Sequence, residues 1–132
     1  MASIFTKIIN KEIPCYKVAE TDDYLAFLDV RPLCLGHTLV IPKKEIDYIF
    51  DLEDAYYTGL HLFSKKVAKA IKQVVPCKRI GVAVIGLEVA HAHIHLVPMN
   101  HIGDLNFEKE RAVISPAQYE DIATQIANAV EY

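Results

Sequence analysis

Residues 87–98 read Leu-Glu-Val-Ala-His-Ala-His-Ile-His-Leu-Val-Pro, and this stretch carries three histidines at alternate positions. In an extended strand, alternate side chains point to the same face of the sheet. A strand over residues 89–97 therefore turns the three imidazoles to one face and turns Ala92, Ile94 and Leu96 toward a core. Same-face residues lie roughly 6.6 to 6.8 Å apart, so long side chains can converge on one small anion or metal.

The strict alternation of His91, His93 and His95 indicates a functional site. A single strand histidine is usually a partly buried, hydrogen-bonded residue, whereas neighbouring imidazoles have poor strand propensity and repel one another when protonated. Neutral imidazole is both a common metal ligand and a nucleophile or acid–base group. The spacing leaves a three-histidine metal site and a catalytic site open. The metal site is disfavoured because residues 87–98 contain no Asp, Glu or Cys except Glu88, which faces away.

The composition is that of one ordinary folded domain. The chain has 132 residues, 52% hydrophobic and 23% charged, and we see no repeat, low-complexity stretch or linker. A single domain over residues 1–132 is expected. Three cysteines, odd in number and widely spaced, favour a reducing, cytoplasmic location.

Charge and hydropathy exclude two classes of partner. No apolar run approaches the roughly 20 residues that a bilayer crossing needs, so we expect no membrane partner. The net charge of −3 gives no basic surface for a nucleic-acid backbone, so we expect no nucleic acid either. Any phosphate must be held by local contacts.

The periodicity of apolar residues, with the caps and turns between them, predicts an α+β domain. In chain order we expect a short helix between Ser3 and Pro14, strands over 17–20, 24–30 and 37–41, a long helix over 51–75, strands over 79–85 and 89–97, and a terminal helix opened by the capping box Ser115-Pro116-Ala117-Gln118. These elements assemble most naturally as an antiparallel sheet with the long helix and the terminal helices packed on it.

Residues 91–97, HAHIHLV, match the His-φ-His-φ-His-φ-φ motif, in which φ is an apolar residue, and the chain resembles the histidine triad (HIT) family. Residues 3–14 resemble the family's amino-terminal helix, and residues 25–30 resemble its nucleoside-contacting strand. Residues 36–43 resemble the strand that brings a fourth histidine to the site. The resemblance covers residues 3 to about 98 in order, and it implies the HIT-like fold and a homodimer.

This resemblance implies a role for each histidine. His93, the middle residue of the motif, attacks the α-phosphorus and forms a nucleotidyl-histidine that water resolves. His95 and His37 contact phosphate oxygens, and His91 helps to orient the nucleophile, partly through its backbone carbonyl. Such a division suits the chemistry, because the nucleophilic imidazole must be neutral with a fixed tautomer while other groups donate to the phosphoryl oxygens.

The resemblance also implies a purine nucleotide as ligand. Asp29 binds the ribose hydroxyls, and Phe5, Ile8, Phe27 and Leu28 sandwich the base. The expected activity is nucleotidyl hydrolysis or transfer at the α-phosphate of nucleoside monophosphate derivatives, such as phosphoramidates or dinucleoside polyphosphates, without a cofactor. Two alternatives stay open: a nucleotide-binding protein with little turnover, and a metalloprotein with three histidine ligands.

The chain departs from the family pattern near the phosphate. Many members place Gln four residues before the first motif histidine, where this chain has Leu87, and Asn at the end of the preceding strand, where residues 82–85 read Val-Ala-Val-Ile. The chain thus lacks two neutral donors, and Leu87 with Val89 is expected to give the approach to His93 an apolar lining.

A further departure concerns metal. Some bacterial members hold a structural zinc through a Cys-x-x-Cys pair near the amino terminus and a histidine after the Ile-Pro-Lys stretch. Those positions here are Ser3, Thr6 and Glu45, so only His91 remains of the set. Since structural zinc takes four Cys or His ligands, we expect no bound metal.

Overall fold

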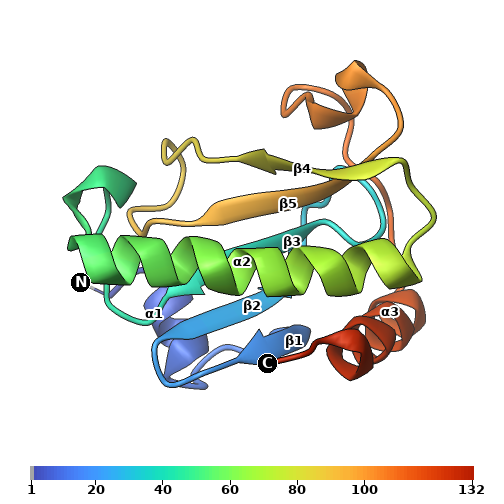
Figure 1. Cartoon of the computed structure of the whole chain (residues 1–132). Helices are drawn as coiled ribbons and strands as arrows, with labels where there is room; N and C mark the ends of the chain where they lie inside the picture. The colour runs from blue at the N-terminus through green and yellow to red at the C-terminus, as the bar shows by residue number, and fades with distance from the viewer. Residues whose placement is uncertain (1) are drawn as a thin grey trace.

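Alternating apolar residues build a five-stranded antiparallel sheet at the centre of the molecule (Figure 1). The computed structural model describes residues 2–132. Its strands are β1 (Lys17–Glu20), β2 (Tyr24–Leu28), β3 (Thr38–Pro42), β4 (Arg79–Ala83) and β5 (Ile94–Met99), in the spatial order β1-β2-β3-β5-β4. Its helices are α1 (Ile4–Ile9), α2 (Asp54–Val74) and α3 (Pro116–Ala129), with short 3-10 turns η1 (Ile49–Asp51) and η2 (Ile102–Leu105). The predicted α+β fold is confirmed.

The two faces of the sheet are covered by different helices. Along β2, Ala26 and Leu28 point into the main core beneath α2 and α3, whereas Leu25 and Phe27 point to the opposite face. There they join Phe5 of α1 in a second, smaller apolar cluster. Figure 1 shows α2 crossing the near face of the sheet and α1 behind it.

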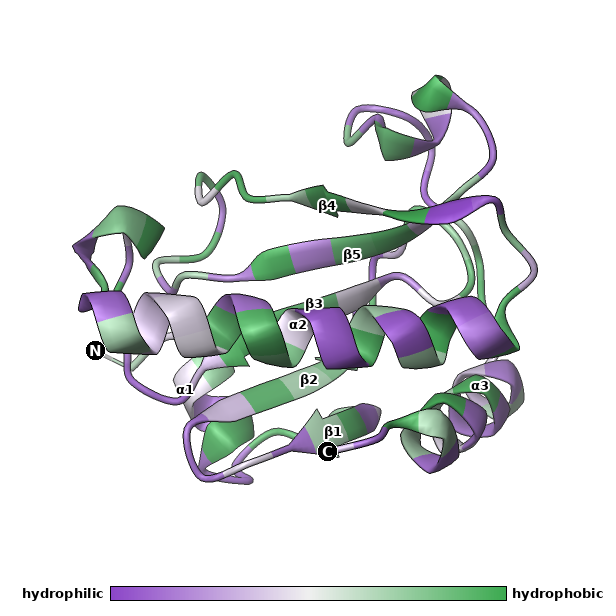
Figure 2. Ribbon diagram, in the orientation of Figure 1, coloured by the Kyte–Doolittle hydropathy of each residue, from purple (hydrophilic) through white to green (hydrophobic). Residues whose placement is uncertain are grey.

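The long helix α2 is held by one apolar stripe. Its buried residues recur at helical spacing and comprise Leu60, Phe63, Ser64, Val67, Ala70 and Ile71. Complete burial of a residue such as Leu60 stabilises the fold by roughly 1.5–3 kcal/mol. Figure 2 shows hydrophobic and hydrophilic bands alternating along this helix.

The strand that carries the triad begins later than its sequence pattern predicts. It starts at Ile94 rather than Val89, so His91 and His93 precede it. The backbone N–H of His91 donates to Val89 in a tight turn at 2.8 Å, and that of Ala92 donates to Ile46 at 2.7 Å. This segment lies outside the ladder, because the pairing with β3 ends at Ile94.

Other boundaries shift by a few residues. β2 ends at Leu28 and β4 at Ala83, earlier than expected, and β3 runs from Thr38 through Pro42. α2 begins at Asp54, because Asp51 belongs to the 3-10 turn η1 rather than to the helix. Within residues 2–132, no helix combines the length and apolarity that a membrane crossing requires.

Candidate active site

The histidines gather on the face of the sheet that α1 covers. His95 pairs in register with Leu39 of β3, whose side chain belongs to the cluster around Phe5. His37 immediately precedes β3 and is 1% exposed. The sheet pairing of β3 and β5 therefore brings these two imidazoles together.

Backbone contacts determine which nitrogens of His37 and His95 carry protons. The backbone N–H of Leu33 donates to His37 Nδ1 at 2.9 Å, so the His37 proton lies on Nε2. That N–H in turn donates to His95 Nδ1 at 3.0 Å. His95 therefore carries its own proton on Nε2, where it remains a donor for a ligand.

Both members of this pair are neutral at physiological pH. Burial lowers the pKa of His37 to about 4, and the charges of Arg111 and Lys109 contribute to the lowering while Asp29 opposes it. Burial also lowers the pKa of His95 to about 3, with smaller contributions from His37, His93 and Arg111. A low-dielectric environment disfavours the charged imidazolium.

His93 is arranged differently, because in its neutral form the nitrogen that faces away from the backbone is the one without a proton. Its Nδ1–H donates to the backbone carbonyl of His91 at 2.7 Å, which leaves a lone pair on Nε2. The ring lies 5.0 Å from that of His95 and 5.1 Å from that of Phe5, centroid to centroid. A neutral imidazole with an available lone pair beside an N–H donor can attack an electrophilic phosphorus.

The His91 ring does not face a common point with the rings of the other two histidines of the motif. Its Nε2–H donates to the carbonyl of Pro42 at 2.8 Å, and its Nδ1 accepts from Ser3 Oγ at 2.9 Å. Both nitrogens are thus engaged by protein groups, and the ring is fully buried. The expectation that three imidazoles converge is wrong for His91, because the segment before Ile94 is not a strand.

The three residues at the family's zinc positions form a hydrogen-bonded cluster around His91. Glu45 Oε1 accepts from the backbone N–H of Ser3 at 2.5 Å and from Thr6 Oγ1 at 2.6 Å. These hydrogen bonds lower the pKa of the Glu45 carboxyl to about 2. The cluster connects the first turn of α1 to the loop that carries His91.

One group of residues within the described chain brings metal-ligating atoms close together. Atoms of Asp29, His37 and His95 lie within 4.8 Å of one another. The proton of His37 occupies the nitrogen that would have to bind the metal, because Leu33 N–H holds the other one. The two histidines of this group are therefore hydrogen-bonded to each other, with the Asp29 carboxylate 3.5 Å from His37 Nε2, rather than a set of free lone pairs.

The residues expected to contact the nucleoside separate into two groups. Phe5 and Phe27 pack edge to face at 5.5 Å, and the half-buried Ile8 packs against the same cluster. Asp29 follows β2, and its carboxylate accepts from the backbone N–H of Arg31 at 2.8 Å and lies 3.5 Å from His37 Nε2. The expectation that Leu28 contacts the base is wrong. Its side chain points into the main core, because adjacent strand residues face opposite ways.

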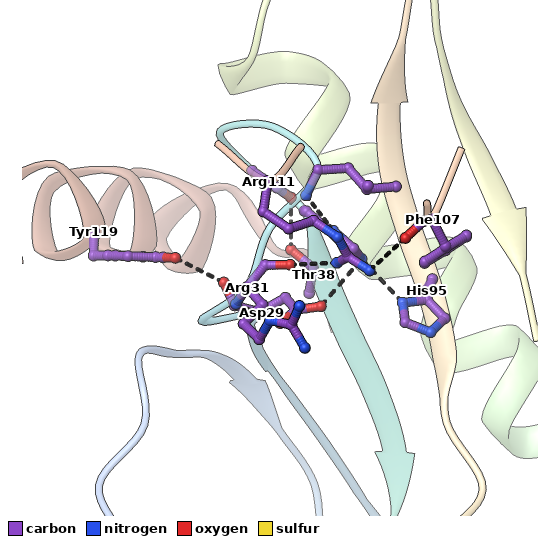
Figure 3. A network of polar contacts seen from close by, with 10 residues as sticks. Asp29, Arg31, Thr38, His95, Phe107, Arg111 and Tyr119 are labelled. Atoms are coloured by element: carbon purple, nitrogen blue, oxygen red, sulfur yellow. Dashed lines mark hydrogen bonds and ion pairs between the residues drawn. The ribbon is translucent and has the colours of Figure 1, made fainter. Parts of the chain in front are cut away.

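Sequence reasoning missed two residues at this site. The ring of Phe107 lies 4.7 Å from that of His95, and Arg111 donates to the carbonyls of Arg31 and Phe107 (Figure 3). Both lie beyond residue 98, outside the segments that resemble the family, in a loop without a motif. Leu87, expected near His93, is 88% exposed.

Comparisons with known proteins agree with this geometry. A model of the HIT domain matches residues 10–102. Adenosine 5′-monophosphoramidase of Schizosaccharomyces pombe is 33% identical over 133 residues, which cover 99% of this chain and 100% of that protein. Among solved structures, a Hit-like protein from Bartonella henselae has a TM-score of 0.84 at 31% identity, covering 97% of this chain and 96% of its own. A zinc-bound histidine triad family protein from Mycobacterium smegmatis has a TM-score of 0.81 at 25% identity, and the match covers 98% of this chain and 93% of that protein.

Proposed function

Because the chain belongs to the histidine triad (HIT) family, we propose that it is a nucleotide hydrolase or transferase acting at the α-phosphate of purine nucleoside monophosphate derivatives. The Schizosaccharomyces pombe relative is named an adenosine 5′-monophosphoramidase. This name supports phosphoramidates as the proposed substrates of this chain. Dinucleoside polyphosphates present the same α-phosphate and are included in the proposal.

The observation that carries the proposal is the state of His93. Its Nδ1–H is anchored on the His91 carbonyl, so the Nε2 lone pair is available on a ring that stays in place. Preorganisation of this kind removes the cost of orienting the nucleophile during reaction. His95 Nε2–H is a donor beside it, suited to a phosphoryl oxygen or to the leaving group.

The proposed reaction proceeds in two steps. His93 Nε2 forms a bond to the α-phosphorus while the bond to the leaving group breaks; the leaving group keeps the electron pair and takes its proton from solvent, and the neutral His95 donates a hydrogen bond to a phosphoryl oxygen. Water then attacks the phosphorus and loses a proton to solvent, while the bond between phosphorus and His93 Nε2 breaks and its electron pair returns to Nε2, which releases the nucleoside monophosphate and free His93. Asp29 holds the ribose, and Phe5, Ile8 and Phe27 hold the base.

The first test replaces the nucleophile. The His93→Ala variant should lose hydrolysis of adenosine 5′-phosphoramidate by at least about 10³-fold but retain AMP binding, because ribose and base contacts lie elsewhere. Turnover is followed by release of AMP, and binding by calorimetry. The matched control is His101→Ala, which removes an exposed histidine outside the site. Wild-type turnover in His93→Ala would refute the assignment.

A nucleotide-binding protein with little turnover is the second candidate. It is favoured by the apolar residues 82–85 and the exposed Leu87, which leave the phosphate without the amide donors that many relatives carry. The same assay distinguishes the two candidates, since a binding protein shows AMP affinity in the wild type without measurable release from the phosphoramidate.

We also propose that residues 1–132 act as one domain that assembles as a homodimer. The strand β4 lies at the edge of the sheet, and Val82, Val84 and Ile85 at this edge are all exposed, as is Leu62 of α2. Such a surface suits a two-fold contact.

We propose a cytoplasmic location as well. It is supported by the three cysteine thiols, which are free in the structure.

A further inference from the structure

The loop between η2 and α3 places unpaired positive charges beside the histidine pair. Along this loop Phe107, Lys109 and Arg111 are half-buried, whereas Glu108 and Glu110 are exposed. Phe107 and Glu108 lie in a turn and Lys109 in a bend, closed by a hydrogen bond from the Lys109 N–H to the Asn106 carbonyl at 3.2 Å. Two of the three half-buried residues are cations.

Phe107 positions this loop against the site. Its ring lies 4.7 Å from that of His95 and 6.1 Å from that of His37, centroid to centroid. The Arg111 guanidinium carbon lies 5.6 Å from the same ring, and Figure 3 shows Arg111 and Phe107 together with His95. Arg111 also donates to the carbonyl of Arg31, a residue whose own N–H binds the Asp29 carboxylate. The guanidinium is thus fixed close to both the histidine pair and the carboxylate assigned to the ribose.

The two cations have no carboxylate partner in the described part of the chain. Within residues 2–132, neither Lys109 nor Arg111 forms an ion pair, and the Arg111 hydrogen bonds go to two backbone carbonyls. A guanidinium has five N–H groups, so three of its donors remain. The effect of both charges on the pKa of His37 shows that their field reaches the buried pair. Unpaired cations beside neutral donors are suited to an anion.

We propose that Arg111 and Lys109 form a subsite for a second phosphate group of the nucleotide, beside the His37–His95 pair. This inference rests on the proposed function, and it identifies substrates with two or more phosphates as the preferred class. The second phosphate is either in the leaving group, as in a nucleoside diphosphate or dinucleoside polyphosphate, or on the ribose. In a protein of net charge −3, this subsite provides the local attraction that the whole chain lacks.

The test measures binding of three nucleotides by calorimetry in the His93→Ala background, which prevents turnover. AMP has one phosphate, ADP adds the second on the leaving-group side, and adenosine 3′,5′-bisphosphate adds it on the ribose. We expect one of the two doubly phosphorylated nucleotides to bind about tenfold more tightly than AMP, as charge-assisted hydrogen bonds predict. Tighter binding of ADP places the second phosphate on the leaving-group side, and tighter binding of adenosine 3′,5′-bisphosphate places it on the ribose.

Two variants remove the subsite. Arg111→Gln and Lys109→Gln should each reduce the affinity for the preferred nucleotide by about three- to tenfold, and Lys109→Gln should change AMP affinity less than about twofold. The Lys109 ammonium forms no ion pair within residues 2–132, so its variant tests the subsite without disturbing the loop. The matched control is Lys69→Gln, which removes an exposed positive charge on α2.

Three results would overturn the subsite while leaving the proposed function intact. In the first, AMP and both doubly phosphorylated nucleotides bind equally well. In the second, the two variants weaken AMP as much as the other two ligands. In the third, Lys69→Gln has the same effect as they do. Failure of wild-type protein to bind any of the three nucleotides would instead overturn the proposed function, and the subsite with it.

Discussion

Backbone groups determine the proton positions of three site histidines, and one of these determines that of the fourth. The N–H of Leu33 holds His37 Nδ1, and the carbonyls of Pro42 and His91 hold His91 Nε2 and His93 Nδ1. Since His37 then determines the tautomer of His95, no imidazole is free to exchange roles with its neighbour. A fixed tautomer matters because a nucleophile and a donor need opposite protonation at the nitrogen that faces the ligand.

Ser3 is the side chain on which the placement of His91 depends most. Its hydroxyl accepts from the Thr6 N–H, as the cap of α1, and donates to His91 Nδ1. We predict that Ser3→Ala lowers the free energy of unfolding by about 2–4 kcal/mol, because it loses a cap worth about 1 kcal/mol and leaves a buried nitrogen unpaired. Turnover should fall as well, since the His91 carbonyl anchors His93.

Ser115→Ala is the matched control for this prediction. Ser115 caps α3 by accepting from the Gln118 N–H, and within the described residues it forms no hydrogen bond to a histidine. Its loss should lower the free energy of unfolding by only about 1 kcal/mol and leave turnover unchanged. Urea unfolding of both variants gives the comparison, and equal losses would mean that the Ser3–His91 hydrogen bond contributes nothing.

The turn that leads into β3 depends on one glycine. Gly36 has a φ of +94°, and a Cβ at this position would lie 2.9 Å from a methyl of Val75 and 3.3 Å from Pro98. The next residue is His37, so this close approach of the turn to the end of α2 also fixes a histidine of the site. A side chain here meets both backbone strain and a steric clash.

We predict that Gly36→Ala destabilises the protein by about 2–4 kcal/mol and reduces activity. Gly86→Ala separates the two causes, because Gly86 has a φ of +80° but no described atom within 4 Å of the position of its Cβ. That variant should lose only about 1–2 kcal/mol, the cost of backbone strain. Denaturant unfolding measures both, and equal losses would show that contact with Val75 is unimportant.

Across the whole fold, burial of neutral histidines makes stability depend on pH. The pKa values of about 4 for His37 and about 3 for His95 lie below the ordinary value of 6.5, so the unfolded chain binds these protons more readily. Their contribution is complete above pH 6.5 and is lost as the pH falls toward 4 and then 3. Each histidine lowers the free energy of unfolding by up to about 1.4 kcal/mol per pH unit.

Thermal unfolding at about pH 7, 6 and 5 tests this prediction, and Tm should fall with each step. The carboxylate of Glu20, with a pKa of about 2, loses its ion pairs only below its ordinary value of 4.5 and does not interfere in this range. The His37→Gln variant should reduce the dependence of Tm on pH, because one titrating group is removed. The His101→Gln variant, which changes an exposed histidine, should leave that dependence unchanged. A constant Tm between pH 7 and 5 would contradict the burial of neutral imidazoles.

Local patterns in the chain were enough to predict the elements. The apolar spacing of α2, the caps at Ser3 and Ser115 and the turn between β1 and β2 act between residues close in sequence, and each lies where it was expected within a few residues. The HIT-like fold followed from the motif at residues 91–97 together with three other segments. Period two also contained the signal that Leu28 faces away from Phe27, which the base-contact hypothesis overlooked.

The partners of the buried polar groups were decided by tertiary structure alone. Ser3 and His91 are 88 residues apart, and His37 and His95 are 58 apart, so no local pattern relates them. The start of β5 at Ile94 depends on where the ladder with β3 ends, and the position of Arg111 depends on how a motif-free loop packs through Phe107. Periodicity reports which face of its own element a side chain occupies; a hydrogen bond or charge contact between distant segments exists only after the sheet has brought them together.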